Sequence, residues 1–136
     1  MTLTLRVLAP DQSIYDGAAD EVILPSASGQ MGILTGHVSM LTALDSGVVR
    51  VRDGGSWSSI AVMGGFAEVE DNAVTVLVNA AELGSTIDAA AAQSAFEAAQ
   101  QTAASFDGQP ASPDKVKAQQ ALSQARARLQ ASKGGI

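Results

Sequence analysis

The sequence predicts an α+β protein: an N-terminal antiparallel β-sandwich, or flattened barrel, followed by a C-terminal antiparallel hairpin of two helices. In the first part of the chain, turn residues separate short apolar or alternating segments about every eight to twelve positions, which is typical of a sandwich. Alanine-rich segments occupy the rest. The charge changes at the same place, since residues 1–87 carry a net −7 and residues 88–136 a net +1. We therefore expect a strand unit at 1–84 and a helical unit at 85–136.

The first half of the strand unit contains two apolar segments and a glycine-rich one. Residues 3–8 alternate with a period of two, as a half-buried strand does. Residues 22–24 form a short apolar run that Pro25 closes. The segment 28–36 is rich in glycine but lacks the Gly-Lys-Ser/Thr ending of a phosphate-binding loop, so we expect a tight loop between strands.

Two pairs of strands joined by turn residues follow. The predicted strands are at 47–52 with 57–63, and at 66–70 with 74–78. Asp53-Gly54-Gly55 joins the first pair and Asp71-Asn72 joins the second, and both are hairpin signals. Gly64-Gly65, between the pairs, predicts a bulge or a bend.

The first helix is predicted from its alanine content, because alanine has the highest intrinsic helix propensity. Ser85 or Thr86 is the expected N-cap, with Asp88 in the first turn, where a negative charge favours the helix dipole. The helix should end near residues 106–110, which include glycine and proline. Its apolar stripe is expected at Ala89, Ala92, Phe96, Ala99 and Ala103.

The second helix has clear boundaries in the sequence. Ser112-Pro113-Asp114 supplies a cap, a proline at the first helical position and an acidic first turn, and Gly134-Gly135 is a stop signal. The expected apolar stripe is Ala118, Leu122, Ala125 and Leu129. Because the two helices carry few large apolar side chains, we expect them to be held on the strands by only a few kcal/mol.

Composition excludes several kinds of function. The chain has no cysteine and one histidine, so we expect no metal site and no bound cofactor. The net charge of −6 and the aromatic content of 4% argue against nucleic acid as a partner. No run approaches the ~18 apolar residues of a membrane span, and the first residues lack the basic-then-apolar pattern of a leader.

Catalysis is not expected either. His37 would need a serine nucleophile and an orienting carboxylate, and no Gly-x-Ser-x-Gly elbow is present. A loop histidine with a structural hydrogen bond or a partner contact is the simpler interpretation. We therefore expect a protein that is not an enzyme.

The second helix carries five positive side chains and one negative one. Two interpretations remain open: a solvated helix face, or a cationic surface for an acidic partner, which would weaken with salt. The positive side chains are Lys115, Lys117, Arg126, Arg128 and Lys133.

The segment Leu24-Pro25-Ser26-Ala27-Ser28-Gly29-Gln30-Met31-Gly32-Ile33-Leu34-Thr35-Gly36-His37, followed by residues 41–44 and 47–51, resembles the epsilon subunit of F-type ATP synthases. Residues 64–69 and 74–78 fall where that family has its second signature. The resemblance extends over the whole chain, and it is greatest to the cyanobacterial and chloroplast branch.

The resemblance implies a non-catalytic rotor subunit of a proton-translocating ATP synthase, in the central stalk. The strand unit would bind the gamma subunit and the ring of c subunits, with Ser28, Gln30 and His37 at the ring. The helical unit would restrain ATP hydrolysis by bringing its five basic residues near an acidic segment of the beta subunits. The alternative is a free-standing β-sandwich that binds a ligand and carries a helical appendage.

Some family members bind ATP through a motif of the form Ile/Leu-Asp-x-x-Arg-Ala. Here Ile87-Asp88 begins the motif, but Ala91 takes the arginine position, and the next arginine along the chain is Arg126. We therefore expect weak or absent ATP binding at Ile87, Asp88 and Arg126. The resemblance also implies a peripheral location on the thylakoid membrane, facing the stroma or cytoplasm, or alternatively on the cytoplasmic face of a bacterial plasma membrane.

Overall fold

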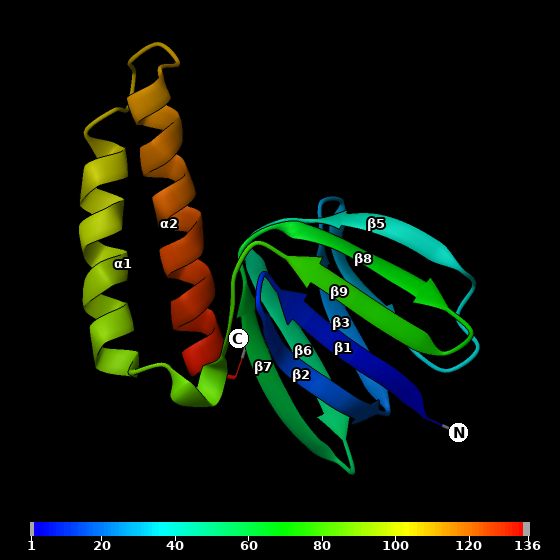
Figure 1. Cartoon of the computed structure of the whole chain (residues 1–136). Helices are drawn as coiled ribbons and strands as arrows, with labels where there is room; N and C mark the ends of the chain where they lie inside the picture. The colour runs from blue at the N-terminus through cyan, green and yellow to red at the C-terminus, as the bar shows by residue number, and fades with distance from the viewer. Residues whose placement is uncertain (1, 135–136) are drawn as a thin grey trace.

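The computed structural model describes residues 2–134, which form a strand unit followed by two antiparallel helices (Figure 1). The strands are β1 (Leu3–Ala9), β2 (Gln12–Ala19), β3 (Glu21–Ser26), β4 (Gly29–Ile33), β5 (Met40–Leu44), β6 (Gly47–Asp53), β7 (Ser56–Val62), β8 (Gly65–Glu70), β9 (Ala73–Val78) and β10 (Ala81–Leu83). A short 3₁₀ turn, η1 (Gly84–Thr86), leads to α1 (Ala89–Ala104) and α2 (Pro113–Ser132). The predicted fold class is confirmed.

The strands form one sheet that folds over on itself into two layers. Its order is β10-β7-β6-β3-β5-β8-β9-β1-β2, with β4 paired to the other side of β3. The sheet bends over between β3 and β5, where the only paired residues are Ser26 and Leu44. Pairing is antiparallel except between β1 and β9. The inward side chains of both layers form the main core, with Leu5, Leu24 and Val74 fully buried.

Four strands were not predicted. The segment 28–36 was expected as a loop, but Gly29–Ile33 is strand β4, paired with β3 from Val22↔Ile33 to Ser26↔Gly29. The glycines obscured it, although Ile33 is fully buried in the core. β2 and β5 were missed because neither shows a clean alternation of apolar and polar residues, and β10 was missed because it has only three residues.

The predicted turns are confirmed by backbone geometry. Gly54 and Gly55 have φ of +60° and +86°, and Asp71 and Asn72 have φ of +49° and +63°. Two successive positive φ values are what a two-residue hairpin turn of type I′ requires. Pro25 lies inside β3 rather than beyond it, at a point where the pairing of β3 with β6 has already ended.

The helix boundaries correct one prediction and confirm another. Ser85 and Thr86 lie in η1, so neither caps α1; Asp88 is the N-cap, and its carboxylate accepts the Ala91 N–H at 3.0 Å. Ser112 caps α2 as predicted, by accepting the Lys115 N–H at 3.1 Å. α2 ends at Ser132, before Gly134 with φ of +82°; Gly135, the other half of the predicted stop, and Ile136 lie outside the described residues.

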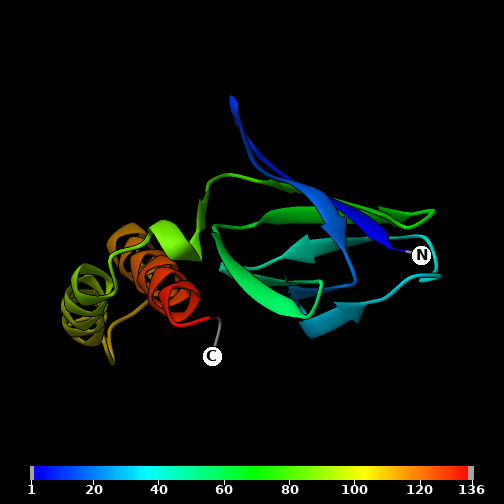
Figure 2. The ribbon, with the colours of Figure 1, turned by 90° about the horizontal axis from the view of Figure 1, so that it is seen from below.

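α2 lies between α1 and the sheet, so the helical hairpin is a layer beside the sandwich (Figures 1 and 2). A second, small apolar cluster holds it there: Val48 and Ala61 from β6 and β7, Ile87, Ala92 from α1, and Leu129 and Ala131 from α2. The residues of the predicted stripes are buried or half-buried, except that Ala89 is exposed. The small size of this cluster agrees with the expected weak anchoring.

Candidate functional site

The first candidate surface is the distal loop, residues 34–39, at the end of the strand unit away from the helices. Leu34 and Val38 are 53% and 74% exposed, and Leu41 just beyond is 68% exposed. The loop is fixed, because Gly36 N–H donates to Asn72 Oδ1 in the β8–β9 turn at 2.7 Å. A fixed loop that exposes several large apolar side chains is typical of an interaction surface.

His37 lies within this loop and is half-buried. Its Nδ1 is 2.7 Å from the carbonyl oxygen of Val38, and its N–H donates to the carbonyl of Leu34 at 3.2 Å. Ser28 and Gln30, the other two predicted residues of this site, are exposed. Ser28 directly precedes β4, and Gln30 is its second residue. Since β4 spans five residues, or about 17 Å, Ser28 and Gln30 lie toward the start of the strand and His37 lies beyond its end, so the three residues do not form one cluster.

The second surface is an apolar row across the outer face of the second layer, and sequence reasoning missed it. Phe66 and Leu77 are 44% and 38% exposed and lie opposite each other on β8 and β9. Ala43 on β5 and Leu8 on β1 continue the row on either side. The sequence contained a signal for this row. Phe66 and Leu77 alternate along their strands with residues that are buried, so both side chains were bound to lie on the outer face of the sheet.

A hollow of about 390 Å³ adjoins this row. It is lined by Leu8, Pro10, Phe66, Leu77 and Asn79 among others. The apolar row therefore offers both a raised aromatic side chain and a depression for a partner's side chain.

The third surface is the basic helix α2. Its five positive residues do not form one solvent-exposed face, because three of them contact other residues of the chain. Arg128 forms a two-pronged ion pair with Glu82 on β10, with Nε–Oε1 at 3.0 Å and Nη2–Oε2 at 3.2 Å. The guanidinium of Arg126 lies 6.0 Å from the Phe96 ring centre. Lys115 donates to the Gln109 carbonyl at 2.7 Å. Lys117 and Lys133 are exposed.

A second polar contact holds α2 on the sheet. The buried hydroxyl of Ser59 on β7 donates to the carbonyl of Ala131 at 2.7 Å. Together with the pair between Arg128 and Glu82, it joins the last turns of α2 to the strands. Nothing in the sequence pattern singled out Glu82 or Ser59, because their partners are 46 and 72 residues away.

The three residues of the predicted nucleotide site do not converge. Ile87 is buried in the small apolar cluster, and the carboxylate of Asp88 is occupied in capping α1. Arg126 lies against Phe96, two turns along α1 from Asp88. Weak or absent ATP binding stays a prediction.

Aromatic and cationic groups of β2, β6 and β7 lie apart from these three surfaces. The Arg50 guanidinium lies 4.6 Å above the Trp57 ring. Burial, reinforced by the negative charge of Asp53, raises the pKa of Tyr15, whose hydroxyl donates to the Ala18 carbonyl at 3.1 Å. These contacts brace the sheet.

Comparison with known protein families covers both halves of the chain. Residues 2–84 match the family model of the ATP synthase delta/epsilon chain, β-sandwich domain, and residues 85–133 match that of its long α-helix domain. The chain belongs to the ATP synthase delta/epsilon family. Membership excludes the alternative of a free-standing ligand-binding module, and it makes the chain a non-catalytic stalk subunit, peripheral to the membrane part of the complex.

Relatives in the family are close in sequence. The chain is 70% identical over 133 residues to the ATP synthase epsilon chain of Synechococcus sp. (strain CC9902), covering 98% of both chains. It is 61% identical to that of Prochlorococcus marinus (strain MIT 9303), covering 98% of this chain and all of the relative.

Solved structures share the fold at lower identity. A chain of the Euglena gracilis mitochondrial ATP synthase superposes with a TM-score of 0.79 at 24% identity, covering 97% of this chain and 81% of that one. A chain of the Tetrahymena thermophila mitochondrial ATP synthase gives 0.61 at 14%, covering 97% of each. Across residues 2–134, no helix combines the length and the hydropathy needed to cross a bilayer.

Proposed function

We propose that this chain is the rotor subunit that joins the gamma subunit to the c-ring of a proton-translocating ATP synthase, and that its helical hairpin restrains ATP hydrolysis. In this proposal residues 1–84 bind the stalk and the ring, and residues 85–136 regulate. The observation that carries it is that the strand unit exposes two separate apolar surfaces, the distal loop and the apolar row. Two surfaces allow two partners to bind at once.

We assign the distal loop to the c-ring and the apolar row to the gamma subunit. The structurally similar chains come from assemblies of F1 with the c-ring and of the central stalk with the c-ring. At the ring, Leu34, His37 and Val38 would make the main contact, and Ser28 and Gln30, toward the start of β4, would lie at its periphery. Because these residues carry no carboxylate, apolar burial rather than charge pairing would supply the affinity.

Single substitutions in each surface separate the two partners. Phe66→Ser should weaken binding of the purified gamma subunit about tenfold or more, because exposed aromatic anchors dominate interfaces. Val38→Ser should leave that affinity within about twofold, yet lower the amount of F1 retained on membranes that contain the c-ring. Titration calorimetry and a membrane-binding assay measure the two effects. Each variant is the other's control, and equal effects on both partners would contradict the assignment.

The contacts of Arg128 support the proposed regulatory role. In the docked hairpin its guanidinium is bound to Glu82, so it is unavailable for the acidic segment of a beta subunit. Docking on the strands and inhibition of hydrolysis would then compete for one side chain. Small changes in the docking contacts would shift the populations of the two states.

Changing the two partners of this ion pair should therefore shift hydrolysis in opposite directions. Glu82→Gln frees Arg128 and should strengthen inhibition, whereas Arg128→Gln removes the inhibitory charge and should relieve it. A partly exposed pair contributes about 0.2–1 kcal/mol, so the changes in ATP hydrolysis rate should be about 1.4- to fivefold. Glu97→Gln, on the exposed side of α1, is the matched control. Changes of the same sign in both variants would refute the competition.

We place the complex on the thylakoid membrane, with the chain on its stromal or cytoplasmic side; the alternative is the cytoplasmic face of a bacterial plasma membrane. The high identity to epsilon chains of Synechococcus and Prochlorococcus supports the thylakoid.

A further inference from the structure

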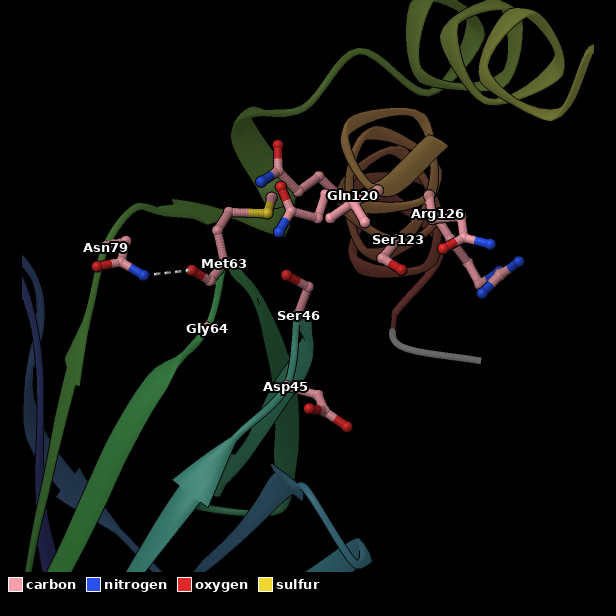
Figure 3. A pocket seen from close by; sticks show the side chains of 11 residues that line it. Asp45, Ser46, Met63, Gly64, Asn79, Gln120, Ser123 and Arg126 are labelled. Atoms are coloured by element: carbon pink, nitrogen blue, oxygen red, sulfur yellow. Dashed lines mark hydrogen bonds between the residues drawn. The ribbon is translucent and has the colours of Figure 1, made fainter. Parts of the chain in front are cut away.

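An open groove separates the N-terminal half of α2 from the ends of the strands. Its volume is about 720 Å³. Asp45, Ser46, Met63, Gly64 and Asn79 form the strand side, and α2 supplies Val116, Gln119, Gln120, Ser123, Gln124 and Arg126 (Figure 3). The strand side is firmly built, because Asn79 Nδ2 donates to the Met63 carbonyl at 3.2 Å and Asn79 N–H donates to the Gly64 carbonyl at 3.2 Å.

The groove exists because the face of α2 toward the sheet carries polar residues in its first half and small buried alanines in its last turns. Residues 116, 120, 123, 127 and 131 share one face at helical spacing. Ala127 and Ala131 are buried, and they let the last turns approach the sheet closely. Gln120 and Ser123 are polar and gain nothing from apolar burial, so the preceding turns stay separated from the strands.

The groove is continuous with the apolar row. Asn79 lines both the groove and the hollow beside Phe66 and Leu77, and Gly64 and Gly65 are adjacent in the chain, one in each. A partner seated on the row therefore lies next to the mouth of the groove. The side-chain amides along it, from Asn79 and the three glutamines, both donate and accept hydrogen bonds, as the peptide groups of a polar segment do.

We propose that the gamma subunit, bound at the apolar row, extends a polar segment into this groove and contacts α2. The inference rests on the proposed function, since it needs that subunit at Phe66 and Leu77. The groove exists only while α2 is docked on the strands, because one wall belongs to the helix and the other to the sheet. Binding of the segment and docking of the hairpin therefore strengthen each other, as linkage requires.

Hydrogen exchange on the full-length chain tests this with no substitution. Adding purified gamma subunit should slow exchange of the amides of residues 119–124 about tenfold relative to those of 93–101 on the outer helix. Slower exchange at β8 and β9 with no change at 119–124 would overturn the groove contact and leave the proposed function standing. Absence of slowing at β8 and β9 would overturn both.

A pair of substitutions gives an independent readout. Gln120→Trp should fill the groove and weaken binding of the gamma subunit at least about fivefold, whereas Gln101→Trp, on the exposed face of α1, should leave it unchanged. Exchange of residues 127–132 in the isolated variant shows whether the hairpin is still docked. With the hairpin docked, equal affinities of the two variants would overturn the proposal. If Gln120→Trp undocks the hairpin, the exchange experiment on the wild-type chain decides whether the gamma subunit contacts the groove.

Discussion

Replacing Gly84 by alanine is expected to release the helical hairpin from the sheet and leave the strands folded. A Cβ at this position would lie 2.3 Å from the carbonyl oxygen of Ala131 and 2.7 Å from the hydroxyl of Ser59. These are the two atoms of the buried hydrogen bond that holds the end of α2, so the helix must move away and the bond must break. Such overpacking costs about 1–3 kcal/mol, which is comparable to the expected free energy of docking.

The amides of α2 should then exchange at least about tenfold faster, with no change in the strands, and the assembled enzyme should hydrolyse ATP more slowly. Gly17→Ala is the control, because a Cβ there meets only Tyr15 atoms at 3.6 Å or more, which is ordinary contact. Unchanged exchange in α2 of the Gly84 variant would show that the hairpin tolerates the displacement. It would also show that the contact between Ser59 and Ala131 does not govern docking.

Replacing Gly65 by alanine is expected to destabilise the strand unit itself by about 3 kcal/mol or more. A Cβ there would lie 2.1 Å from the Leu77 carbonyl oxygen and 2.8 Å from the Val78 Cα, both backbone atoms of the neighbouring strand. The pairing of β8 with β9 would have to open, which would also disrupt the apolar row. Gly65 has φ of +145°, which adds backbone strain for any other residue.

Urea unfolding followed by Trp57 fluorescence measures the loss. Gly29→Ala separates the steric effect from the backbone strain, because Gly29 has a similar φ of +122° but open space where its Cβ would lie. We expect this control to lose only about 1 kcal/mol. Equal losses in the two variants would mean that the close approach of β8 to β9 at Gly65 is not limiting.

Local sequence patterns predicted those turns and helix ends that are determined by a few neighbouring residues. The hairpin turns at Asp53-Gly54-Gly55 and Asp71-Asn72 were predicted because only a few residue types adopt two successive positive φ values. The start of α2 at Ser112-Pro113 was predicted for the same kind of reason, since cap and proline act on neighbouring backbone atoms. The N-cap of α1 was misplaced because Ser85, Thr86 and Asp88 are all capping residues, and the η1 turn that packs on β7 selected the last of them.

The candidate surfaces were predicted less completely. The resemblance assigned Ser28, Gln30 and His37 to the c-ring and the basic residues of the second helix to the beta subunits, and both assignments stay predictions. It also gave the family that both halves of the chain match. It could not show that Ser28 and His37 lie beyond opposite ends of β4, because that segment was predicted to be a loop. The apolar row also escaped notice, since it joins residues of β1, β5, β8 and β9 that are neighbours only in the sheet.

By itself the sequence determined the division into a strand unit and a helical hairpin, the main turns and the family, because these depend on residue types within short segments. Only the tertiary structure decided which charges are free. Arg128 is occupied because Glu82, 46 residues away on β10, lies opposite it where α2 meets the sheet. The end of α2 is held because Ser59, 72 residues from Ala131, donates a hydrogen bond to the Ala131 carbonyl. Pairings over such separations are set by the packing of α2 on the sheet, which no local pattern encodes.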